Sequence, residues 1–113
     1  MDISKDLIAA SATPLVLTIL SQGESYGYAI IKRVHELSGG NMNFSDGMLY
    51  PVLHRLEKQK LIVSQTQQAE NGRMRKYYRI KKEGKRAINE YKQQWTAVYA
   101  TLKQVWEVNP CLS

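Results

Sequence analysis

Residues 45–80 constrain the fold more than any other stretch, because a helical pattern there is followed by the pattern of a basic hairpin. The first half repeats apolar residues at helical spacing, which places them on one side of a helix. These residues are Leu49, Val52, Leu53 and Leu56. Two strand-like runs, 61–67 and 74–80, then flank the Asn71-Gly72 pair, which is a strong turn signal. A helix followed by a hairpin with a basic tip is typical of a winged helix.

The other side of the predicted helix is free for contacts, and it carries Gly47, Tyr50, Pro51, His54 and Lys58. Ser45 is placed to cap the helix. A helix about 10 to 12 Å across fits the major groove of B-DNA. A cationic hairpin beside it can reach the flanking phosphates or the minor groove. We therefore expect double-stranded DNA to be bound by this side of the helix and by the hairpin tip, residues 71–76.

The net charge supports a polyanionic partner through its location more than through its size. The formal charge is +6. Between residues 55 and 86 there are eleven Lys and Arg against three Glu, a local balance of +8, so the rest of the chain carries −2. All of the excess positive charge therefore lies in the segment that contains the predicted helix end and hairpin.

A chain of 113 residues accommodates one core, and we expect a mainly α fold with a small β-hairpin wing. Residues 1–81 are predicted to form a winged helix-turn-helix DNA-binding unit. This unit includes an N-terminal helix over 4–21 and a second helix over 26–37, which Ser25 caps. Pro14 interrupts the first helical pattern, so we expect either a kinked helix or one that begins near Thr13.

Residues 82–108 are predicted to form a long C-terminal helix on the same core, with apolar positions at alternating spacings of three and four. Such an a/d repeat forms the seam of a coiled coil. Its positions are Ile88, Tyr91, Trp95, Val98, Leu102 and Val105. The first helix can cover part of this seam, but the same helix of a second copy buries it more simply, which predicts a homodimer. Two reading helices one helical turn apart match a palindromic operator.

Enzymatic chemistry is poorly supported by the sequence. The chain has two His, one Cys and three Asp, none at a spacing typical of a nucleophile with its base or of a metal site. We therefore expect no catalytic residue, metal or cofactor. Cys111 has no partner for an intramolecular disulfide, which suits a reducing cytoplasm. Without a secretory signal or an apolar run of about 18 residues, we expect a cytoplasmic protein with no membrane partner.

An alternative function is that of a winged-helix protein-interaction module without a small-molecule effector. It predicts an apolar exposed side on the helix and a neutral hairpin tip, whereas this chain has polar groups on that side and three cations at the tip. RNA binding is also disfavoured, because the A-form major groove is too narrow for a reading helix. The salt dependence of DNA affinity distinguishes these classes.

Three strings occur together in a characteristic order: YGYAII at 26–31, MLYPVLHRLE at 48–57 and GRMRKYY at 72–78. With them the chain resembles the PadR-type winged-helix transcriptional regulators, over residues 7–106. The single C-terminal helix is similar to that of the smaller members, which include bacterial regulators of multidrug exporters. The resemblance implies a homodimeric repressor that leaves its operator when a small, often aromatic, molecule binds.

The resemblance assigns DNA contact to residues 45–58 and to the wing over 71–76. It implies that Tyr50 contacts phosphate and that Met48, Pro51 and His54 lie near base edges. Met48 stands where the family more often has a small polar residue, and Lys60 replaces a common glycine. The residues expected to bind DNA are Ser45, Met48, Tyr50, Pro51, His54, Lys58, Asn71, Arg73, Arg75 and Lys76.

Trp95 matches a tryptophan that, in multidrug-binding members of the family, lies on the dimer axis and stacks flat ligands. The resemblance therefore implies a site there for a small aromatic ligand. From the helical pattern alone, Trp95 is a seam residue that packs in the dimer, and both interpretations stay open. The other residues expected to line this space are Ser11, Pro14, Thr18 and Tyr99.

Overall fold

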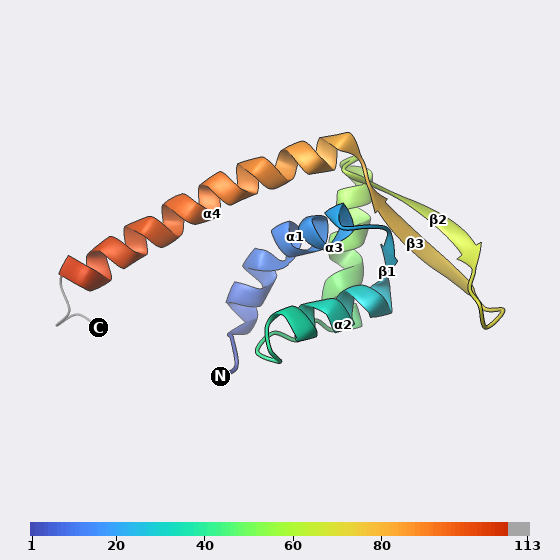
Figure 1. The fold of residues 1–113 in the computed structure, drawn as a ribbon, viewed down its shortest axis with the longest axis horizontal. Coiled ribbons are helices and arrows are strands. Elements are labelled where there is room, and N and C mark those ends of the chain that lie inside the picture. The colour runs from blue at the N-terminus through green and yellow to red at the C-terminus, as the bar shows by residue number, and fades with distance from the viewer. Residues whose placement is uncertain (109–113) are drawn as a thin grey trace.

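The computed structural model describes residues 1–108, and Cys111 lies outside that range. The described residues form four helices and three strands (Figure 1). In chain order these are α1 (Lys5–Ser21), β1 (Ser25–Tyr26), α2 (Gly27–Leu37), α3 (Asp46–Lys58), β2 (Ile62–Gln68), β3 (Met74–Ile80) and α4 (Lys82–Val108). The mainly α fold with a hairpin wing and a long C-terminal helix is confirmed.

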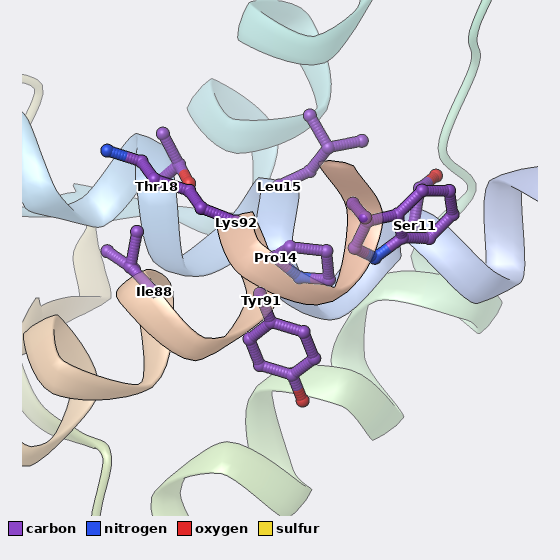
Figure 2. A pocket seen from close by; sticks show the side chains of 8 residues that line it. Ser11, Pro14, Leu15, Thr18, Ile88, Tyr91 and Lys92 are labelled. Carbon is purple, nitrogen blue, oxygen red and sulfur yellow. The ribbon is translucent and has the colours of Figure 1, made fainter. Parts of the chain in front are cut away.

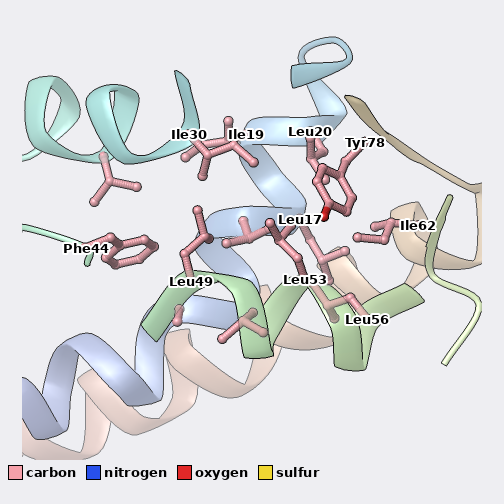
Figure 3. Packing of buried hydrophobic residues seen from close by; sticks show 14 of the residues in the cluster. Leu17, Ile19, Leu20, Ile30, Phe44, Leu49, Leu53, Leu56, Ile62 and Tyr78 are labelled. Atoms are coloured by element: carbon pink, nitrogen blue, oxygen red, sulfur yellow. The ribbon is translucent and has the colours of Figure 1, made fainter. Parts of the chain in front are cut away.

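The hydrophobic core lies between α1, α2, α3 and the base of the hairpin (Figure 3). Leu17 and Leu20 of α1 meet Leu49, Leu53 and Leu56 of α3, and all five are fully buried. α3 buries one stripe at helical spacing and leaves its other side in solvent. Residues 11–20 of α1 are all buried or half-buried, because α4 packs against α1 as well. The other labelled members of the cluster are Ile19, Ile30, Phe44, Ile62 and Tyr78.

α1 is a single helix that runs through Pro14. Ser4 caps it by accepting a hydrogen bond from the backbone amide three residues later, at 3.3 Å, and Ile8 in its first turns is buried. The expectation that this helix begins near Thr13 is therefore wrong. Capping and burial of the early turns outweigh the one backbone hydrogen bond that an internal proline removes.

The sequence does not predict β1, which precedes α2 and pairs antiparallel with β3. Ser25 lies opposite Tyr78 and Tyr26 opposite Tyr77, and the sheet order is β1-β3-β2. Ser25 therefore belongs to a strand, and Tyr26 occupies the N-cap position of α2 without a side-chain hydrogen bond, which corrects the predicted cap. Two residues are too few to show strand alternation. The pairing holds the start of α2 beside the hairpin.

β2 and β3 form the predicted antiparallel hairpin, with β2 beginning and ending one residue later than expected. At the turn, Gly72 has a φ of 83°, which glycine adopts without strain. The Asn71 Oδ1 accepts a hydrogen bond from the Arg73 amide at 3.0 Å. The predicted Asn71-Gly72 turn is confirmed, and it places Arg73 at the hairpin tip.

α4 packs through its first turns and projects beyond them. A Cβ at Gly84 would lie 2.7 Å from Ile80 Cγ1, so glycine permits the close approach of α4 to the hairpin base. At about 1.5 Å per residue, the helix is roughly 40 Å long. Its C-terminal half and the hairpin extend from opposite ends of the helical body (Figure 1).

Candidate nucleic-acid interface

α3 turns a polar side towards solvent. Tyr50 is 46% exposed, and the other exposed residues on this side are Pro51, His54 and Lys58. Ser45 accepts a hydrogen bond from the Met48 amide at 3.2 Å and so serves as the N-cap. Met48 is half-buried and packs against the core. The side of α3 that the sequence assigns to DNA is therefore accessible, with Met48 only partly so.

Tyr50 lies across the start of α2. A Cβ at Gly27 would lie 2.8 Å from Tyr50 Cζ and would also collide with the hydroxyl. Glycine at this position therefore lets the tyrosine ring cross the helix start closely. This contact joins α2 to the exposed side of α3.

Arg75 lies over the ring of Tyr26, which in turn contacts Tyr77. Its guanidinium carbon lies 4.4 Å from the centroid of the Tyr26 ring, a cation–π contact. The Tyr26 and Tyr77 rings meet edge to face, with centroids 5.4 Å apart and planes at 72°. Sequence reasoning missed Tyr26 because its place depends on β1.

The other face of the hairpin is joined to α3 through Glu57. The Glu57 Oε2 accepts hydrogen bonds from the Ser64 amide at 3.1 Å and from the Ser64 hydroxyl. Its Oε1 lies 3.9 Å from Lys76 Nζ. This ion pair directs Lys76 towards α3. Burial is the main cause that raises the pKa of Tyr78 above its ordinary 10.0, and the negative charge of Glu57 is the next.

A groove of about 510 Å³ separates the hairpin from the starts of α2 and α3. Its lining consists of three tyrosines, three cations, one glycine and one methionine: Tyr26, Tyr28, Tyr50, Arg73, Arg75, Lys76, Gly27 and Met74. Cations interleaved with aromatic rings suit the charged and partly apolar surface of a nucleic acid. Of the residues predicted to bind DNA, this groove brings together Tyr50, Arg73, Arg75 and Lys76. The remaining six lie outside its lining: Ser45, Met48, Pro51, His54, Lys58 and Asn71.

Arg55 belongs to the basic segment of the sequence but makes an internal contact. Its Nη2 donates a hydrogen bond to the Thr13 Oγ1 at 2.8 Å. Thr13 is a buried polar residue of the core, so the bond satisfies its hydroxyl and joins α3 to α1. Part of the local positive charge is thus structural.

A second cavity, of about 220 Å³, lies between α1 and α4. Figure 2 shows Ser11, Pro14 and Thr18 of α1 facing Ile88, Tyr91 and Lys92 of α4. Leu15 and Trp95 complete the lining, whereas Tyr99 is not part of it. Four of the five predicted ligand residues are thus brought together. The α4 residues that were missed lie three, four and seven positions before Trp95, a helical spacing that identifies its neighbours.

The predicted seam of α4 is covered at one end only. Ile88 is 8% exposed and belongs to the core of its own chain, and Tyr91 is half-buried beside it. Trp95 is 38% exposed and Leu102 is 44% exposed. Val98 and Val105 are exposed as well. The part of the seam that is open to another molecule therefore begins near Trp95.

The two histidines have separate surroundings. His35 Nδ1 lies 2.6 Å from the Asn43 Oδ1, so its side chain joins α2 to the segment before α3. His54 is on the exposed side of α3. Within residues 1–108, no three His, Cys, Asp or Glu side chains gather as a metal site would require. The same residues contain no helix with the length and apolar character needed to cross a membrane.

Comparison with known proteins gives a consistent result. The model of the family described as "Transcriptional regulator PadR-like family" matches residues 16–90. Transcriptional regulator YqjI of Escherichia coli (strain K12) is 32% identical over 89 residues, which cover 79% of this chain and 41% of YqjI. The chain therefore spans less than half the length of that relative.

Solved structures match nearly the whole chain. A transcriptional regulator from Clostridium thermocellum has a TM-score of 0.82 and 29% identity, covering 90% of this chain and 96% of that one. A PadR family transcriptional regulator from Eggerthella lenta DSM 2243 has a TM-score of 0.78 and 32% identity, covering 92% of this chain and 88% of that one. In both cases the likeness extends over about nine-tenths of this chain.

Proposed function

The chain belongs to the PadR-like family of transcriptional regulators, and from that premise we propose that it acts as a homodimeric repressor. Two copies join through α4, and each applies α3 and its hairpin to one half of a palindromic operator. A flat aromatic molecule bound between α1 and α4 releases the dimer from DNA. In this proposal residues 1–81 form the DNA-binding unit and residues 82–108 the dimerisation helix.

The proposal of DNA binding depends chiefly on the groove shared by α3 and the hairpin. The three cations at the hairpin tip and three tyrosines line this same groove. The exposed side of α3 offers polar groups, including His54 and Lys58, instead of the apolar surface that a protein-interaction module needs. In the proposed complex, α3 lies in the major groove with Pro51 and His54 near base edges, and the hairpin cations meet phosphates.

The proposed dimer is supported by the exposed seam of α4. Apolar side chains at heptad spacing are costly to leave in water on a helix that projects from the body. Ile88 is omitted from the proposed interface, since its own chain buries it. The interface then consists of Trp95, Val98, Leu102 and Val105, with Tyr91 at its inner edge.

The proposed ligand site is supported by the cavity between α1 and α4. Its 220 Å³ in a single chain is below the range of about 300 to 1,000 Å³ typical of small-molecule sites. Trp95 lines the cavity and also begins the exposed seam. A second copy that covers the seam brings an equivalent cavity alongside, which enlarges the space available to a flat aromatic molecule.

Selection of bound sequences from a library of random duplexes tests the proposed function directly. We expect enrichment of an inverted repeat whose half-sites are separated by about one helical turn, roughly 10 base pairs. A library that stays random after repeated selection, or enrichment of a single unrepeated motif, contradicts the proposal of a dimeric reader.

A further inference from the structure

We propose that Glu57 is a positioning residue that holds the hairpin at one angle to α3 and so sets the spacing between the two elements that contact DNA. We call Glu57 with its partners Ser64 and Lys76 the Glu57 link. This inference rests on the proposed function, because it requires α3 and the hairpin to engage the same duplex.

One carboxylate ties both strands of the hairpin to α3. Ser64 of β2 donates twice to the Glu57 Oε2, through its amide at 3.1 Å and through its hydroxyl. Lys76 of β3 places its Nζ 3.9 Å from Oε1. Hydrogen bonds to an ionised acceptor are about twice as strong as neutral ones, whereas an exposed ion pair contributes less. The two bonds from Ser64 therefore supply most of the restraint.

The Glu57 link is made on the face of the hairpin that packs against the core. Ser64 lies opposite Tyr78 and Thr66 opposite Lys76, so strand alternation puts Ser64, Lys76 and Tyr78 on one face. Tyr78 is buried in the core beside them. Arg75 lies on the other face, over Tyr26. One face therefore holds the hairpin against the core and α3, and the other face carries Arg75.

A negative charge in this place opposes DNA binding by itself. Glu57 lies among the cations of residues 55–86, and a carboxylate there weakens their attraction for phosphate. The link offers a compensating gain, because a hairpin held before binding loses less conformational freedom when it contacts DNA. The two effects predict opposite results when the charge is removed.

Glu57→Gln keeps the size of the side chain and removes its charge. Electrostatics alone predicts tighter DNA binding by this variant, whereas the Glu57 link predicts binding that is about threefold to tenfold weaker. Glu70→Gln is the matched control, since it removes the same charge at the hairpin tip, where Glu70 has no ion pair among residues 1–108. Affinity is measured by fluorescence anisotropy with a short duplex of random sequence, and thermal unfolding checks that each variant is folded.

Ser64→Ala tests the same link without any change of charge, and we expect it to weaken binding as well. A second measurement needs no DNA. In the free protein, the backbone heteronuclear NOE values of Gly72 and Arg73 are expected to fall in Glu57→Gln and Ser64→Ala and to stay unchanged in Glu70→Gln.

The outcomes separate the link from the proposed function. If Glu57→Gln binds DNA as tightly as Glu70→Gln, and its tip amides keep their NOE values, the positioning role is overturned while DNA binding stands. If the unchanged protein ignores the duplex, the proposed function fails, and the NOE values alone decide whether the link restrains the hairpin.

Discussion

The three cations at the hairpin tip have different surroundings, which distinguishes their roles at the level of single residues. Arg75 is stacked on Tyr26, Lys76 is paired with Glu57, and Arg73 lies at the tip beside the turn. A stacked guanidinium is already ordered, so it loses little freedom when it meets a phosphate. Lys76 must first leave its carboxylate. Arg75 is therefore the hairpin cation best prepared for DNA.

Arg75→Ala is expected to weaken binding to a selected operator and to a random duplex alike, because a hairpin cation chiefly meets backbone phosphate. Because each dimer then loses two phosphate contacts, one per copy, the slope of log Kd against log salt also falls by about 2. The measurement is a salt titration with both duplexes. Lys103→Ala, which removes a cation paired with Glu107 near the end of α4, is the control and leaves both affinities unchanged. A loss confined to the operator contradicts the assignment to backbone.

Lys60 is the one non-glycine residue among 1–108 with a positive φ, at 63°. It follows α3 and leads the chain into β2, and its amide donates to the Glu57 carbonyl oxygen at 3.0 Å. A residue with a Cβ is disfavoured in this left-handed region. The turn between α3 and the hairpin therefore stores backbone strain in a position that suits glycine.

Lys60→Gly is expected to raise the free energy of unfolding by about 1 kcal/mol, because it relieves this strain. Urea unfolding measures the change. Lys60→Ala removes the same charge but keeps the Cβ, so it serves as the control and brings no comparable gain. Equal stability of the glycine and alanine variants argues that the backbone at residue 60 is unstrained.

Among the elements, α4 has two parts with different surroundings. Its first turns pack against the body of the same chain, where Gly84 allows close contact and Ile88 enters the core. Its later turns carry the exposed seam, of which Leu102 is a central member. The proposed dimerisation through the later turns therefore leaves the fold of the single chain undisturbed.

Leu102→Glu is expected to convert the proposed dimer to a folded monomer, since it places charges inside an apolar seam. Sedimentation velocity at micromolar concentration measures the change, and circular dichroism checks the fold. Ala100→Glu introduces the same charge on the outer side of α4, two residues away, and preserves the dimer as the control. If both variants sediment like the unchanged protein, α4 is not the interface.

The cavity between α1 and α4 predicts a fluorescence signal. A flat aromatic dye bound there is expected to quench Trp95, which lines the cavity, and Trp95→Ala abolishes that part of the quenching. Trp106 is exposed and outside the lining, so its emission is the internal control. Quenching that is the same in the Trp95→Ala variant removes the case for a ligand site at this position.

Strong periodicity explains which elements the sequence predicts. The apolar stripe of α3 and the Asn71-Gly72 turn are local signals, and both appear in the structure as expected. β1 is different, because its two residues gain their strand conformation only by pairing with β3. α1 likewise continues through Pro14 because its early turns are buried. The local preferences of proline do not take such burial into account.

In the candidate sites too, local sequence patterns predict some residues, whereas others depend on tertiary contacts. Helical spacing places Pro14 and Thr18 on one side of α1, and the family resemblance implies a ligand site at Trp95 of α4. The structure brings all three to one cavity. Tyr26 and Arg75 are far apart in the sequence and meet only in the folded chain. The contact of Glu57 with Ser64 depends on how β2 is placed against α3. Such contacts depend on tertiary packing and could not be predicted from one sequence.

The whole molecule is elongated, measuring 58 × 30 × 21 Å. The hairpin extends from one end of the helical body and the tail of α4 from the other (Figure 1). In the proposed dimer, the paired α4 tails lie at the centre and the two hairpins point outward. Each copy then supplies one α3 and one hairpin to the same duplex.

Joint binding of one duplex by two copies is tested by the affinity of the unchanged protein for double-stranded DNA, measured as a function of salt. Each phosphate that the dimer neutralises adds about 0.9 to the slope of log Kd against log salt, and two copies of the groove cations contribute together. We expect a slope of several units, with one dimer bound per duplex. An affinity that does not vary with salt, or binding by a single chain, contradicts the account.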